Sequence, residues 1–177
     1  METSDAKRTI LITVSGPDHP GVTSSLMGAL SSVGVDLLDV EQVVIHNHLT
    51  LGVLVTADGD VEDLQDAVSA QMADRGMHVD IDLDPHGREQ AASTHAVVVL
   101  GRPISAEAFQ AVAAELHRQG ANIDSIRGVA DYPLTGLELM IKAVDTEDSD
   151  AAIREGLGAV SAKYPIDVAV ERGGLAR

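Results

Sequence analysis

Residues whose chemistry suits a small charged ligand are concentrated in one segment, Gly-Pro-Asp-His-Pro-Gly-Val at 16–22. Its two prolines and two glycines fix an unusual backbone path between an apolar run and an apolar pattern of helical spacing. Pro20 suits the first position of that helix, and Gly21 lets a ligand or another backbone come close. The amides of Gly21, Val22 and Thr23 would then point out of the helix start, where the helix dipole favours a carboxylate.

A carboxylate stands beside these amides. Asp18 can accept hydrogen bonds from an ammonium group, so one turn could recognise both ends of an amino-acid zwitterion. The sequence leaves a second interpretation open, an ordinary rigid turn in which Asp18 caps the helix.

Two copies of one unit position this turn. Gly16 and Gly34 recur as Gly101 and Gly120 at nearly the same separation. In each copy the first glycine follows a strand-like run and the second follows a helix-like run. Alternating apolar residues predict strands over 9–15, 37–45, 49–56 and 77–83, and again over 95–100, 122–131, 134–144 and 166–171. Helical spacing predicts a helix after the first and third strands of each copy. The order βαββαβ predicts an α+β fold of two ferredoxin-like domains, each a four-stranded antiparallel sheet with both helices on one face.

The outer faces of these sheets are predicted to be partly apolar, with Leu54 in the first copy and Leu137, Leu139 and Ile141 on one row of the second. Such a face favours pairing with another domain or a second copy.

Composition narrows the classes of function. The 177 residues include 12 basic and 28 acidic side chains, so the formal net charge is −16, which disfavours nucleic acid and membrane surfaces as partners. Aromatic residues are only 2% and cysteine is absent, which argues against base-stacking platforms, disulfides and Cys-ligated zinc. Without a signal-peptide pattern or an apolar run of about 20 residues, we expect a soluble cytoplasmic protein.

The chain resembles the ACT-domain family, and in particular the tandem ACT region at the N-terminus of actinobacterial phosphoserine phosphatases. The resemblance is carried by stretches in both copies: Leu11–Val14, Asp18–Ser24, Val40–Ile45, Leu49–Val55, Leu100–Ile104, Asn122–Asp124, Ile126–Gly128 and Asp131–Leu139. It implies a disordered N-terminus over 1–8, a first ACT domain over 9–84, a linker over 85–93 and a second ACT domain over 94–172. Residues 173–177 would begin a linker to a catalytic domain that this chain lacks.

The resemblance implies a regulatory module that binds L-serine between ACT domains of two subunits, dimerises, and exerts feedback control on a phosphoserine phosphatase of serine biosynthesis. The site residues that it implies are Asp18, His19, Pro20, Gly21, Val22, Asn122, Ile123 and Asp124. No catalytic residue, metal site or cofactor is expected in this chain, and Mg²⁺ belongs to the hydrolase domain of the full-length protein. The second copy's turn, Gly101–Ser105, lacks the Pro-Gly step, so the two copies are not expected to bind equivalently.

Three patterns imitate other functions. Asp80, Asp82 and Asp84 resemble a phosphatase nucleophile motif but are predicted to be a solvent-facing row, since Asp84 stands where Thr or Val is required. His46 and His48 are predicted to be turn residues without a third metal ligand. The acidic run 145–150 is predicted to be a solvated helix start.

Two other functions remain as alternatives. One is a ligand-free dimerisation module that only holds subunits together. The other is an enzyme of the acylphosphatase kind, which is disfavoured because no arginine-bearing glycine loop follows the first strand.

Overall fold

The computed structural model describes residues 8–58, 61–85, 92–130, 133–144 and 146–173. The chain divides into two compact units, Met1–Arg88 and Glu89–Arg177, and each is described by itself. The predicted linker 85–93 lies mostly outside the described residues, as do the predicted disordered N-terminus except Arg8 and the predicted final linker except Gly173. These boundaries therefore stay predictions.

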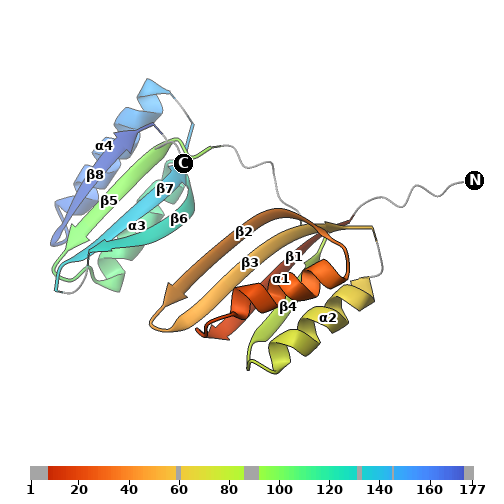
Figure 1. Ribbon diagram of the computed structural model, residues 1–177. Helices are drawn as coiled ribbons and strands as arrows, with labels where there is room; N and C mark the ends of the chain where they lie inside the picture. Colours follow the sequence, from red (N-terminus) through yellow and green to blue (C-terminus); the bar gives the residue numbers. More distant parts are fainter. Residues whose placement is uncertain (1–7, 59–60, 86–91, 131–132, 145, 174–177) are drawn as a thin grey trace, which may run out of the picture. The chain divides into compact units, whose positions relative to one another are not determined.

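Both units have the predicted βαββαβ order (Figure 1). The first consists of β1 (Arg8–Pro17), α1 (Val22–Ser32), β2 (Asp36–Ile45), β3 (His48–Ala57), α2 (Val61–Ala73) and β4 (His78–Leu83). The second consists of β5 (His95–Gly101), α3 (Ala106–Arg118), β6 (Asn122–Ala130), β7 (Thr135–Lys142), α4 (Glu147–Ser161) and β8 (Ile166–Arg172). The antiparallel sheets have the strand orders β2-β3-β1-β4 and β6-β7-β5-β8, which confirms two ferredoxin-like domains.

The period-2 pattern of the central strands builds the first core. Ile10, Ile12 and Val14 on β1 are fully buried, while the residues between them lie on the opposite face of the sheet. The buried row packs against the apolar stripes of α1 and α2, which include Leu26 and Val68. Both helices therefore cover one face of the sheet, as Figure 1 shows.

The second core corrects one prediction. Leu139 and Ile141 are fully buried, and Leu137 packs against the same core, so this row of β7 faces α3 and α4 instead of the outside. The physical reason is that the most apolar row of a strand lies on the side that the helices cover. In the first unit Leu54 does lie on the other face, between buried neighbours in β3.

The edge strand β2 is exposed along its whole length. Its large apolar side chains include Leu37, Val43 and Ile45, whose exposed fractions are 52%, 52% and 64%. The helices pack over the rest of the sheet, and β2 pairs on one side only, with β3. Among the described residues, this strand is thus an apolar edge with a partner strand on one side only.

Candidate functional site

The turn between β1 and α1 leaves the start of α1 uncapped. Gly21 is the N-cap residue, with φ 88° and ψ 2°, and no side chain bonds to the first amides of the helix. Two sequence interpretations are therefore wrong. Pro20 lies before the helix instead of at its first position. Asp18 is not the cap either, because Gly21 occupies the N-cap position. Gly21 has a left-handed backbone conformation there, which only glycine adopts without a steric cost.

Three amides at this helix start remain available. Within the described residues, no hydrogen-bond acceptor is found for the backbone N–H of Gly21, Thr23 or Ser24. The Val22 N–H was predicted to be free but lies 3.4 Å from the carbonyl oxygen of His19, and this long contact closes the turn. Unsatisfied amides at the positive end of a helix dipole attract a carboxylate or another small anion.

Two neighbouring turns hold this loop in place. The Asp18 N–H donates to the carbonyl oxygen of Asn47, at the tip of the β2–β3 hairpin, over 2.8 Å. On the other side, Arg75 Nη1 lies 3.5 Å from the carbonyl oxygen of Pro20. The predicted hairpin turn is confirmed, since His46 and Asn47 both have positive φ, as a two-residue type I′ turn requires. The amides are therefore presented by a fixed backbone.

A hollow of about 460 Å³ opens in front of the α1 start. Its lining includes all five site residues predicted in this turn, together with four residues outside that predicted set: Thr23, Ser24, Gln42 and Leu49. Leu49 is buried and forms part of the apolar lining together with Val22 and Pro20. The side chain of Asp18 makes no hydrogen bond or ion pair with any described residue, so its carboxylate is free to bind a ligand.

The first helix of the second unit has a side-chain cap at its start. Ser105 caps α3 by accepting from the Ala108 N–H over 3.1 Å. The side chain of Ile104 lies so close to Gly101 that a Cβ on this glycine would be 2.8 Å from Ile104 Cγ1. The two turns differ as their sequences predict: a side chain caps the start of α3, whereas no side chain caps the start of α1.

The other three predicted site residues lie together at the beginning of β6, in the second unit. Asn122 and Ile123 pair with Lys142 and Ile141 on β7, and Asp124 stands at a bulge in this pairing. The Asp124 carboxylate accepts from Lys142 Nζ over 2.7 Å and from Ser93 Oγ over 3.1 Å. These residues and the α1 turn belong to different units, and their shared role at one ligand stays a prediction.

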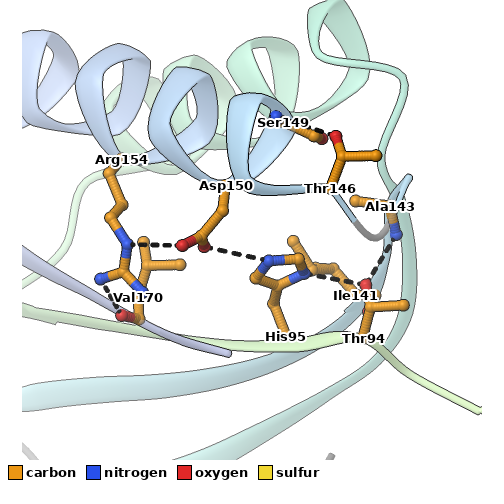
Figure 2. Close-up of polar contacts among 9 residues, drawn as sticks. All are labelled: Thr94, His95, Ile141, Ala143, Thr146, Ser149, Asp150, Arg154 and Val170. Carbon is orange, nitrogen blue, oxygen red and sulfur yellow. Dashed lines mark hydrogen bonds and ion pairs between the residues drawn. The ribbon is translucent and has the colours of Figure 1, made fainter. Parts of the chain in front are cut away.

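A second polar cluster, which the sequence did not indicate, lies in the second unit. The His95 side chain is fully buried, with Nδ1 2.8 Å from Thr94 Oγ1 and Nε2 3.1 Å from Asp150 Oδ1. Figure 2 shows the Asp150 carboxylate between the His95 ring and Arg154, whose guanidinium also donates to the carbonyl oxygen of Val170. Asp150 is thus more than part of a solvated helix start, because it attaches α4 to β5.

This hydroxyl, imidazole and carboxylate have the order of a nucleophilic triad, but their surroundings exclude that chemistry. His95 is 0% exposed, and the Thr94 hydroxyl already accepts from the Ala143 N–H over 2.9 Å. Partial burial would raise the pKa of Asp150, but hydrogen bonds and charges from Arg154 and His95 outweigh it and lower this pKa. The cluster is a structural contact between α4 and β5 that favours the charged form of the carboxylate.

Over the residues that the structure describes, no group of three or more His, Asp or Glu side chains is placed to hold a metal ion. No helix in the same ranges is long and apolar enough to cross a membrane. His46 and His48 are exposed at the hairpin tip, and Asp80 and Asp82 are exposed on β4, as predicted.

Comparison with known proteins gives relatives along the whole chain. It is 48% identical to phosphoserine phosphatase SerB2 of Mycobacterium tuberculosis over 175 residues, which are 97% of this chain and 42% of that protein. It is 35% identical to a phosphoserine phosphatase of Streptomyces coelicolor over 183 residues, 99% of this chain and again 42% of the relative. The chain therefore spans less than half the length of these curated relatives.

The fold is shared with solved structures. A crystal structure of an unknown protein from Galdieria sulphuraria has a TM-score of 0.78 at 18% identity and covers 94% of this chain and 99% of its own. The ACT-domain family matches residues 8–82 and, separately, residues 93–171. These ranges coincide with the two βαββαβ units. The chain belongs to the ACT-domain family and carries two ACT domains, which are homologous to part of the phosphoserine phosphatases named above.

Proposed function

We propose that the first ACT domain binds a small amino acid, L-serine, at the start of α1, and that the pair of domains regulates a phosphoserine phosphatase. The observation that carries this proposal is the uncapped α1 start, whose free Gly21, Thr23 and Ser24 amides open into the same hollow as the unpaired Asp18 carboxylate. Donors for a carboxylate and an acceptor for an ammonium group are what an amino-acid zwitterion requires.

The exposed β2 edge supports a homodimer as part of this function. Its apolar side chains and free backbone groups suit a second copy of the chain, which would remove them from water and extend the sheet. In this proposal Asn122, Ile123 and Asp124 of a second copy complete the site.

The relatives supply the enzyme that such a module would control. Both are phosphoserine phosphatases, and the chain covers 42% of each. Serine is the product of phosphoserine hydrolysis, so a serine site on an attached regulatory module would provide feedback. Neither catalysis nor a cofactor is assigned to the two ACT domains, and Mg²⁺ chemistry belongs to the hydrolase domain in this proposal.

Calorimetric titration of the chain with L-serine, L-alanine, glycine and L-aspartate tests the proposal. We expect serine to bind and to raise the melting temperature progressively, by the equivalent of about 2.7 kcal/mol when serine reaches 100 times its Kd. L-Aspartate is the control, because its second carboxylate would add a negative charge to a site that already holds the Asp18 carboxylate. If no amino acid binds at millimolar concentration, the proposed site is wrong.

A second candidate function rests on the β2 edge alone. A ligand-free dimerisation module would need only this apolar strand. It predicts a dimer whose melting temperature is the same with and without amino acids. It also predicts that a charged residue on the strand, as in Val43→Lys, dissociates the dimer. A dimer that gains stability with serine would exclude this candidate.

A further inference from the structure

Gln42 lies at the side of the α1 hollow, although no sequence pattern marks it. It stands on the edge strand β2, opposite Leu51 of β3, and lines the hollow together with Thr23 and Leu49. Its side chain reaches across to the first turn of α1, where Thr23 Oγ1 lies 2.6 Å from Gln42 Oε1. The edge strand thus contributes a polar group to a site that the turn alone was expected to form.

The Thr23 hydroxyl donates to Oε1 of Gln42 over 2.6 Å, a usual length for an O–H···O hydrogen bond. The Gln42 amide nitrogen is therefore the end of the carboxamide that stays available. Among the described residues no acceptor is found for its two N–H groups.

The pair presents donors and an acceptor side by side. Gln42 Nε2 offers two N–H donors, and the Thr23 oxygen keeps a lone pair after its own proton is used. The buried side chain of Leu49 bounds the same hollow and limits its apolar part. A hydroxyl group could accept from the Gln42 amide nitrogen and donate to the Thr23 oxygen at once, whereas a hydrogen or methyl group could form neither hydrogen bond.

The second unit lacks this pair, which makes an internal comparison possible. Gly16 pairs with Leu49 and Gly101 with Thr135, so the two sheets can be aligned by their registers. By this alignment Gln42 corresponds to Gly128, which pairs with Leu137 and has no side chain. The second unit, in which Ser105 caps α3, therefore has no side chain at the position that Gln42 occupies in the first unit.

We propose that Thr23 and Gln42 are the specificity-determining residues of the α1 site and select an amino acid with a small hydroxyl-bearing side chain. This inference rests on the proposed amino-acid site. It assigns the ligand's side chain to the part of the hollow that Thr23 of α1 and Gln42 of β2 form. The backbone ends of the ligand bind the α1 amides and Asp18, and its hydroxyl binds between Gln42 and Thr23.

The test compares L-serine with L-alanine by calorimetric titration of the whole chain and of three variants. Gln42→Met and Thr23→Val each keep the approximate size of the side chain and remove its hydrogen-bonding group. Gln65→Met, on the exposed face of α2 and outside this hollow, is the matched control. Because Gln42 and Gln65 are both exposed, neither change should prevent folding, and circular dichroism will verify this.

We expect the wild type to bind serine more tightly than alanine. Gln42→Met and Thr23→Val should each reduce the ratio of serine affinity to alanine affinity about three- to tenfold, which is the usual effect of one neutral hydrogen bond. The reduction should come mainly from weaker serine binding. Gln65→Met should leave the ratio unchanged. An unchanged ratio in folded Gln42→Met overturns the specificity role while the amino-acid site stands. If the wild type binds neither ligand, the proposed function itself fails, and the specificity role fails with it.

Discussion

The substitution Gly21→Ala separates the backbone's contribution to folding from its contribution to binding. Gly21 has φ 88°, and an added Cβ would meet only Arg75, at 3.7 and 3.8 Å from its two terminal nitrogens, which are ordinary contacts. The Cβ therefore causes no clash within the chain, and the cost lies in the left-handed backbone. For alanine this cost is about 1–2 kcal/mol, partly offset because alanine also restricts the unfolded chain by about 0.4–1 kcal/mol.

Gly34 provides the matched control at the other end of the same helix. It follows α1 with φ 70°, and an added Cβ would have no atom within 4 Å. Gly34→Ala should therefore destabilise the first unit to a similar extent as Gly21→Ala, by about 1 kcal/mol. In a domain of this size that corresponds to roughly 4–8 °C in melting temperature, which calorimetry or urea unfolding can measure.

The two variants should differ in ligand affinity. Relief of the strain at Gly21 rotates the peptide groups that aim the free amides into the hollow, whereas Gly34 is remote from them. The loss of one charge-assisted hydrogen bond to a carboxylate, about 1.5–3 kcal/mol, would weaken serine binding by about 10- to 100-fold in Gly21→Ala alone. Equal serine affinity in the two variants would refute the assignment of the ligand's carboxylate to this helix start.

Three further changes test the packing of the two cores. Leu51→Ala, at a fully buried position of β3, should cost about 3–5 kcal/mol in urea unfolding, and a loss below about 1 kcal/mol would contradict the core described for the first unit. Asp150, whose pKa is lowered by Arg154 and His95 despite partial burial, adds stability that is present above its unfolded pKa and is lost as the pH falls through the lower folded pKa. Wild type should therefore lose stability below about pH 4 more steeply than Asp150→Asn, and parallel acid-unfolding curves would oppose this. Thr94→Val leaves buried polar groups without a partner and should cost about 1–3 kcal/mol by thermal melting, whereas an unchanged melting temperature would show that the hydroxyl is dispensable.

The amino-acid sequence by itself determined the order of the elements and most of both cores. Period-2 rows such as Ile10, Ile12 and Val14, helical stripes, and glycines at helix ends are local signals, and hydrophobic burial acts on them in the same way in each copy. The turn before α1 was recognisable for the same reason, since proline and glycine restrict or free the backbone where they stand.

Tertiary structure alone decided which distant groups meet. Thr23 and Gln42 are brought together by the register of β2 on β3, and His95 and Asp150 by the docking of α4 on the second sheet. The packing of the layers also decides that Leu139 faces the helices. It likewise decides that Gly21 is the N-cap of α1 and that no side chain caps this helix. Such contacts join residues 19 or 55 positions apart, so their partners are chosen by sheet register and helix docking, which no local pattern of residue types encodes.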